Sequence, residues 1–173
     1  MLFLLCVSAA FGAQQRTTTH ASSERMAALR YLEGRLHRYE QATWYWERLT
    51  GSQRTNTAGR TLSAMAVSDL ERTVARWERR AEQAHRVAQH PPHMSQWMCI
   101  HHYEGAWNDV GSPYWGGLQM SLSFQQHYGS WIYQAKGTAD HWTPLEQIWT
   151  AEKALRSRGF WPWPNTARMC GLI

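Results

Sequence analysis

Apolar residues recur at alternating spacings of three and four in two stretches of the first half of the chain, and this spacing constrains the fold most. They are Leu29, Leu32, Leu36, Tyr39, Thr43 and Trp46, then Val67, Leu70, Val74, Trp77, Ala81, Ala84 and Ala88. Such spacing keeps side chains on one face of a helix, and repetition over several turns is typical of a coiled-coil seam. The sequence therefore predicts two long helices that each bury one stripe.

The segment between the two stretches has the sequence GSQRTNTAGRT and is rich in turn formers. We expect it to reverse the chain, so that residues 22–90 form an antiparallel helical hairpin, a two-stranded coiled coil. The sequence HPPH at 90–93 ends the second helix, because proline cannot continue it. A second, small domain is then expected over residues 95–173, and the fold class is mainly α.

The formal net charge of the 173 residues is +5, and it is unevenly distributed. Between Gln14 and His90 there are 13 Arg or Lys against 8 Asp or Glu, whereas Pro91 to Ile173 has 5 of each. A basic hairpin suits anionic wall polymers or acidic lipid. The plainer alternative is a spacer or dimerising coil with solvated arginines, whose partner is a protein.

The first sixteen residues, MLFLLCVSAAFGAQQR, contain an apolar run of about a dozen residues, shorter than the ~20 that cross a bilayer. The run fits a secretory signal over residues 1–13, with Ala10 and Gly12 as small residues near the cleavage point. No basic residue precedes it, so a start further upstream and an uncleaved anchor stay open. We expect a secreted or extracellular protein, and no nucleic-acid partner. Of the three cysteines, Cys6 lies in the predicted signal, and the remaining Cys99 and Cys170 are an even pair in an exported chain, which favours a disulfide.

A glutamate surrounded by large rings marks the candidate site. Ser95 is expected to cap a short helix over Gln96 to Gly105, and one face of that helix carries Trp97, Ile100, His101 and Glu104. Glu104 would end an apolar stripe close to Trp107, Tyr114 and Trp115. Partial desolvation there suits a general acid.

The residues after Glu104 provide stacking faces and an amide. Residues 108–113 are typical of a turn, Tyr114 to Met120 of a short extended segment, and the pair Gly116-Gly117 permits close approach of backbone or ligand. Aromatic faces together with the amide of Gln119 suit the apolar faces and polar edges of a sugar. Asp109 is expected to be solvated in the turn.

A later helix is predicted by its amino-terminal sequence. Thr143-Pro144-Leu145-Glu146 is typical of a capping box with proline at the first helical position, and the helix should end near Gly159. Leu145, Ile148, Trp149 and Leu155 form its buried stripe. Glu152 falls on the same stripe, and we interpret it as a buried structural acceptor rather than a second catalytic group.

A metal site and a nucleophilic serine hydrolase site have less support in the sequence than the site around Glu104. A loose His/Cys group contains His90, His93, Cys99, His101 and His102, but its spacing matches no familiar zinc site. No Gly-x-Ser-x-Gly sequence occurs. We therefore expect neither a metal nor a cofactor.

The second half resembles the resuscitation-promoting factor domain, a small actinobacterial branch of the lysozyme-like transglycosylases. The resemblance covers roughly Ser95 to Gly171 and is carried by the glutamate that ends a helix, Tyr114-Trp115-Gly116-Gly117-Leu118-Gln119, Glu146-Gln147, Ala151-Glu152, Trp163-Pro164 and Cys170. It implies a small lysozyme-like α+β domain that cleaves peptidoglycan glycan strands, with Glu104 as the catalytic acid and Gln119 as the cleft glutamine. The substrate-binding candidates are Trp107, Asp109, Tyr114, Trp115 and Gln119.

The sequence departs from that family at two positions. Tyr103 stands where the family has a cysteine directly before its glutamate, and Cys99 lies one turn earlier, on the same helix face. Gly105 replaces a common serine. The resemblance implies a bacterial, wall-associated lytic transglycosylase that cuts between N-acetylmuramic acid and N-acetylglucosamine, and we expect Glu104 to be its single acid and base. The alternative is a catalytically weak wall-binding or partner-binding module on the same fold.

Overall fold

The computed structural model describes residues 6–57 and 65–173, and for residues 6–19 and 21 it describes the backbone only. The first five residues of the predicted signal segment lie outside the described residues, as do all of its side chains. Among the described residues, no helix combines the length and the apolar character that crossing a membrane requires.

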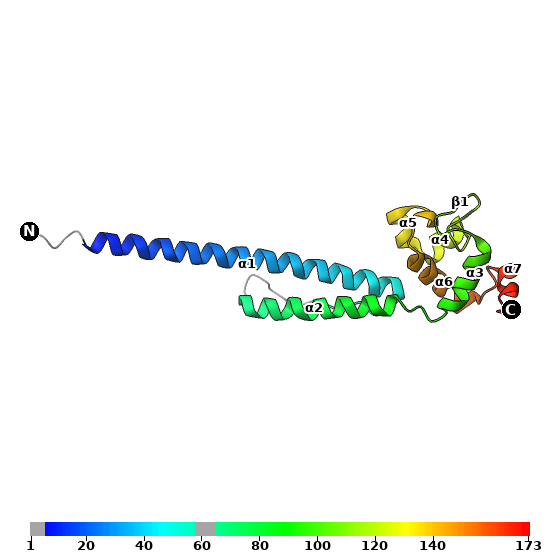
Figure 1. Ribbon diagram of the computed structural model, residues 1–173, viewed down its shortest axis with the longest axis horizontal. Coiled ribbons are helices and arrows are strands. Elements are labelled where there is room, and N and C mark those ends of the chain that lie inside the picture. The colour runs from blue at the N-terminus through cyan, green and yellow to red at the C-terminus, as the bar shows by residue number, and fades with distance from the viewer. Residues whose placement is uncertain (1–5, 58–64) are drawn as a thin grey trace, which may run out of the picture. The chain divides into compact units, whose positions relative to one another are not determined.

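The described residues form seven α-helices, one short 3-10 helix and one small antiparallel sheet (Figure 1), so the prediction of a mainly α chain is confirmed. The chain divides into two compact units. The first comprises the described residues up to Tyr45 together with Arg54–Gln83, and the second comprises Trp46–Gln53 and Ala84–Ile173. The elements are α1 (Cys6–Thr50), α2 (Val67–Ala88), α3 (Met94–Glu104), β1 (Val110–Gly111), β2 (Tyr114–Trp115), β3 (Met120–Ser121), α4 (Leu122–Tyr128), α5 (Ser130–Lys136), η2 (Ala139–His141), α6 (Pro144–Arg158) and α7 (Pro164–Met169).

In the first unit, α1 and α2 pack through the predicted stripes. Their common core consists of Leu29, Leu32, Leu36, Leu70, Val74 and Trp77, and the partly buried Tyr39, Trp44 and Val67 pack against it. A single apolar face on each helix is thus sufficient to hold the pair.

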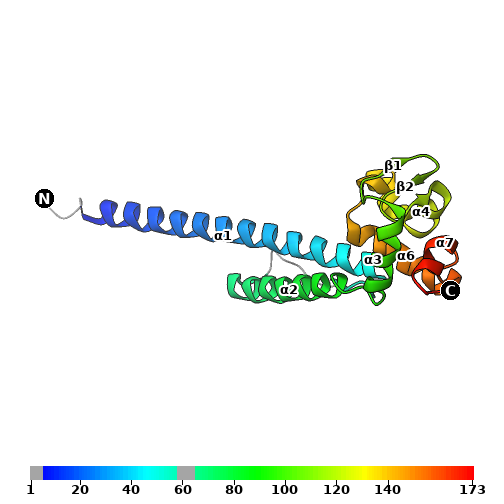
Figure 2. The ribbon, with the colours of Figure 1, turned by 45° about the vertical axis from the view of Figure 1, so that its right-hand side comes forward.

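The two helices run in the same direction, so the prediction of an antiparallel hairpin is wrong. Arg35 lies 3.3 Å from the Glu78 carboxylate, and further along both helices the Trp46 ring stacks on His85 at 4.6 Å between centroids. Residue numbers therefore increase together along the contact. Figures 1 and 2 show α2 beginning beside the middle of α1 and running toward the same end.

The segment between the helices explains this direction. Trp44 Nε1 donates to the Thr55 carbonyl, and the Arg54 guanidinium lies 4.3 Å from the Trp44 ring centroid, so the chain returns along α1 after leaving it. Residues 51–66 reach about 50 Å when extended, whereas the 22 residues of α2 span about 33 Å. After α1, the chain therefore turns back along that helix, and the connection is long enough to reach the start of α2 without a tight reversal.

The second unit contains the three-stranded sheet, in the order β1-β2-β3. Val110 pairs with Trp115 and Tyr114 pairs with Ser121, both in antiparallel register. The predicted extended segment is therefore divided into two strands joined by a tight turn. Gly116 and Gln119 have φ angles of 74° and 47°, and these left-handed conformations reverse the chain between β2 and β3.

Polar side chains fix the helices of the second unit. The predicted capping box of α6 is confirmed, since Thr143 Oγ1 accepts from the Glu146 N–H and the Glu146 carboxylate accepts from the Thr143 N–H. The predicted cap of α3 is wrong. The helix begins at Met94, and the Ser95 hydroxyl donates to the Gln96 side chain instead.

Glu152 is a buried acceptor, as predicted. Its Oε1 accepts from the His93 backbone N–H at 2.9 Å and from Trp97 Nε1 at 3.0 Å. A carboxylate of α6 therefore fixes the position of the chain at the start of α3. The predicted disulfide between Cys99 and Cys170 is also present and joins α3 to the residue after α7.

Candidate functional site

Glu104 is the last residue of α3 and is half-buried. Its Oε1 accepts a hydrogen bond of 2.7 Å from the hydroxyl of Thr166 on α7. The Cys99–Cys170 disulfide ties the same two helices together. The position of the candidate acid is thus fixed by α7, and sequence reasoning missed Thr166 because no spacing rule links it to Glu104.

Asp109 and Gln119 form a polar pair beside the residue that follows the acid. Gln119 Nε2 donates to Asp109 Oδ2 at 2.6 Å and to the Gly116 carbonyl at 3.1 Å. A Cβ placed on Gly105 would lie 3.4 Å from Asp109 Oδ2 and 3.5 Å from Gln119 Nε2. The structure therefore brings this pair close to the backbone of Glu104. The expectation that Asp109 is solvated is wrong, because it is half-buried and accepts a hydrogen bond.

Trp107 is fixed by contacts of both its ring and its backbone carbonyl. Its ring stacks on His101 with centroids 3.9 Å apart, and its carbonyl accepts from Gln147 Nε2 at 2.8 Å. A Cβ on Gly117 would lie 2.7 Å from both the His101 and Trp107 rings. Only glycine therefore fits at 117, and one face of Trp107 is already covered.

Tyr114 and Trp115 are neighbours on β2, and their exposures differ. Tyr114 is 49% exposed and Trp115 is half-buried. Successive residues of a strand point to opposite faces of its sheet. The two rings therefore cannot stack on the same sugar, and Tyr114 is the one open to solvent.

A groove of about 550 Å³ opens beside Tyr114 and Gln119. It is lined by Tyr114, Gln119, Met120, Ser121, Ser123, Phe124, His127, Tyr128, Arg158, Pro162 and Trp163. Its volume is typical of small-molecule sites. Glu104 and Asp109 do not line it. The groove adjoins them through two of its lining residues, because Gln119 donates to Asp109 and the Trp163 carbonyl accepts from Thr166, which also donates to Glu104.

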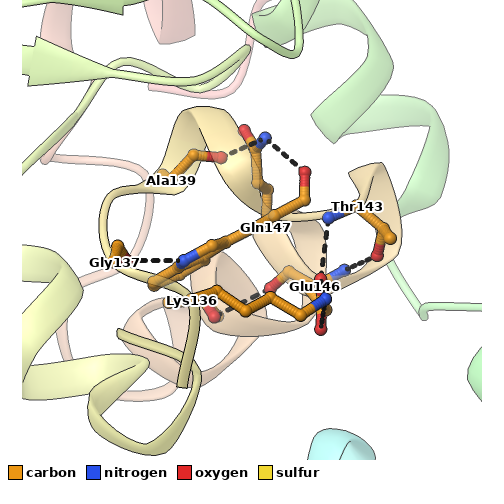
Figure 3. A network of polar contacts seen from close by, with 8 residues as sticks. Lys136, Gly137, Ala139, Thr143, Glu146 and Gln147 are labelled. Atoms are coloured by element: carbon orange, nitrogen blue, oxygen red, sulfur yellow. Dashed lines mark hydrogen bonds and ion pairs between the residues drawn. The ribbon is translucent and has the colours of Figure 1, made fainter. Parts of the chain in front are cut away.

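Gln147 on α6 supports the turn that carries these residues. Its Nε2 donates to the Trp107 carbonyl at 2.8 Å and to the Ala139 carbonyl at 2.9 Å, and Figure 3 shows the contact with Ala139. A Cβ on Gly116 would lie 2.5 Å from Gln147 Oε1. Gln147 is fully buried, and its contacts join α6 to the loop after α3. It lies off the apolar stripe of Leu145, Ile148, Trp149 and Leu155, so helical spacing gave no signal for its role.

The loose His/Cys group is divided among structural contacts. Cys99 is in the disulfide, His93 contacts Glu152, and His101 contacts the Gly117 carbonyl. Within the described residues, no group of three or more His, Cys, Asp or Glu side chains is arranged to hold a metal ion. Comparison of the chain with protein-family models, with curated proteins and with solved structures finds no match.

Proposed function

We propose that the second unit is a lysozyme-like domain similar to the resuscitation-promoting factor domain. In this proposal it cleaves the β-1,4 bond between N-acetylmuramic acid and N-acetylglucosamine in peptidoglycan. The observation that carries the proposal is Glu104, half-buried at the end of α3, with the Asp109–Gln119 pair against Gly105 beside it. The Tyr114-to-Gln119 motif and the aromatic groove give further support.

The proposed chemistry needs one carboxyl group. Glu104 protonates the glycosidic oxygen as the bond to C1 of the muramic acid breaks, and the departing sugar keeps that proton. The Glu104 carboxylate then takes the proton of the 6-hydroxyl, whose oxygen bonds to C1 and closes a 1,6-anhydro ring. The hydrogen bond from Thr166 to Oε1 leaves Oε2 to exchange the proton.

Asp109 and Gln119 have supporting parts in this proposal. Asp109 holds the Gln119 amide nitrogen, and the Gln119 carboxamide oxygen is then directed to accept from an acetamido N–H or a hydroxyl of the sugar. Asp109 therefore positions Gln119 and does not act as a second catalytic carboxylate.

Mass analysis of products from purified peptidoglycan tests the proposal. Glu104→Gln should abolish the 1,6-anhydro products, a loss of at least about a thousandfold. Asp109→Asn should keep activity within about tenfold, because an asparagine oxygen still accepts from Gln119. Glu71→Gln, on the exposed side of α2, is the control. Hydrated reducing-end muramic acid as the main product, with an inactive Asp109→Asn variant, would show a two-carboxylate hydrolase instead.

A wall-binding module is the second candidate function. It is favoured by the groove, whose lining includes Tyr114 and Gln119 but not Glu104. A wild-type protein that binds glycan strands without cutting them, and a Glu104→Gln variant that binds equally well, would support it.

We also propose that the chain is exported, since structural disulfides persist in oxidising compartments. The basic first half then has anionic wall polymers as its proposed partner, and a protein as the alternative. Binding to the polymers should weaken as salt rises, because exposed charges are screened beyond about 8 Å at physiological ionic strength.

A further inference from the structure

The groove beside Gln119 contains basic groups and no carboxylate. Arg158, the last residue of α6, and His127 on α4 both line it. Within the described residues, Arg158 has no ion-pair partner. The groove therefore presents positive charge that the fold itself does not neutralise.

The carboxylates of residues 91–173 have contacts elsewhere. They are Glu104 with Thr166, Asp109 with Gln119, Asp140 with His141, Glu146 with Lys136, and Glu152 with His93 and Trp97. None of the five lines the groove. An arginine in such a place is available for an external anion, because the planar guanidinium can bind a carboxylate through two parallel hydrogen bonds.

The rest of the lining favours a hydroxylated ligand with apolar faces. Trp163 Nε1 donates to the Leu118 carbonyl, and the Phe124 ring packs against Trp163 with centroids 5.4 Å apart, so neighbours hold both lining rings in place. Tyr114, 49% exposed, adds a further ring to the lining. Ser121 and Ser123 line the same groove and add hydroxyl groups. Rings, hydroxyls and an arginine together match an acidic sugar.

We propose that Arg158 binds a carboxylate of the glycan strand, which makes the groove a subsite for the acidic part of the substrate. This inference rests on the proposed function and names the substrate feature that the site selects. The carboxylate has two sources. It is the lactyl group of a strand without peptides, or a carboxylate of the stem peptide on an intact strand.

Binding measured on the full chain in a Glu104→Gln background tests the inference without cleavage. The probes are peptide-bearing glycan fragments, the same fragments after removal of the peptides, and neutral chitin oligosaccharides of equal length. Adding Arg158→Gln should weaken binding of at least one charged probe by about 10- to 100-fold, as expected for a charge-assisted hydrogen bond. Binding of chitin oligosaccharides should change less than about twofold. Arg158→Lys should lie between.

Arg168→Gln is the matched control, because Arg168 is exposed on α7, lies outside the groove and carries the same charge. It should leave all three affinities unchanged. Loss confined to the peptide-free fragments identifies the lactyl carboxylate, and loss confined to the peptide-bearing fragments identifies the stem peptide. An equal loss with chitin, no loss with either charged probe, or no binding of any probe overturns the inference.

The failure of this inference is distinguishable from failure of the proposed function. If the wild-type chain does not cut peptidoglycan but the Arg158→Gln substitution still weakens binding of a charged probe and not of chitin, the proposed enzyme is wrong and the proposed subsite stands. If the wild-type chain cuts peptidoglycan but the Arg158→Gln variant binds every probe with unchanged affinity, the proposed enzyme stands and the proposed subsite is wrong.

Discussion

The two units are stabilised by different kinds of contact. The first unit buries aliphatic and aromatic residues in one stripe, and its buried threonines Thr43 and Thr73 donate to carbonyls four residues earlier in their own helices. The second unit also buries Gln125, Gln147 and Glu152, whose partners are backbone or side-chain groups of other elements. Long-range polar contacts are thus concentrated where the candidate site is built.

This difference predicts different tolerance to substitution. Apolar contacts are non-directional and depend mainly on buried area and volume, so a similar apolar side chain can replace another. A buried donor or acceptor that loses its partner costs the desolvation of the group left behind. The first unit should therefore tolerate changes of shape that the second unit does not.

The largest expected effect follows removal of the disulfide. The double variant Cys99→Ser, Cys170→Ser opens a loop with a sequence separation of 71, and the chain-entropy model gives a loss of about 4 kcal/mol in the free energy of unfolding. Hydrogen exchange read by mass spectrometry should show faster exchange in the second unit and unchanged protection of α2 before Gln83. Equal loss in both units would mean that they unfold together.

The second-largest effect is expected for Gln147→Met. The Trp107 and Ala139 carbonyls lose their donor, which should lower the free energy of unfolding by about 1–3 kcal/mol. Urea unfolding measures this loss, and the proposed activity on peptidoglycan should fall with it, because the turn at Gly116 loses its support. A stability equal to that of the wild type would show that water replaces the amide at no cost.

Leu36→Met in the first unit is the matched comparison, since Leu36 is 1% exposed and the new residue is the same. A volume-conserving apolar exchange should cost less than about 1.5 kcal/mol. The two units do not differ in tolerance if Leu36→Met lowers the free energy of unfolding as much as Gln147→Met does in the same assay.

The smallest effect, with the opposite sign, is expected at Lys153. Burial lowers its pKa, and the charges of Arg48 and Arg156 lower it further. Folding therefore disfavours the charged ammonium, at a cost that is complete below the folded-state pKa and disappears as pH rises toward the ordinary 10.5. Lys153→Met should raise Tm slightly, and the gain should shrink at alkaline pH.

Lys136→Met is the contrasting variant for that prediction. Lys136 Nζ lies 2.8 Å from the fully buried carboxylate of Glu146 (Figure 3), so its removal should lower Tm. A fall in Tm for both variants would contradict the assignment of Lys153 as an unfavourable, half-buried charge.

The sequence by itself determined the features that depend on local spacing. The buried stripes of α1 and α2, the capping box at Thr143 and the buried acceptor Glu152 all follow from periodicity or from residues three apart. The pairing of Cys99 with Cys170 followed once Cys6, in the predicted signal, was set aside. Such signals need no knowledge of distant parts of the chain, because each reports on one helix or one side chain.

The tertiary structure alone decided direction and partnership. The apolar spacing identifies the buried face of a helix but not the direction in which it runs. A connection as long as residues 51–66 permits parallel or antiparallel packing. The parallel course of α2 was therefore not predictable. Thr166 reaches Glu104 across 62 residues, and Asp109 meets Gln119 only because Gly116 and Gly117 fit against Gln147 and Trp107.

The boundary of the second unit was decided in the same way. Leu49 near the end of α1 is fully buried, and the Arg48 guanidinium lies 4.8 Å from the Trp131 ring centroid, so Trp46–Gln53 belongs to the second unit. Trp149 Nε1 likewise donates to the Ala88 carbonyl. Contacts between segments so far apart depend on how the whole chain packs, because burial and hydrogen bonding act on neighbours in space and local sequence spacing does not specify those neighbours.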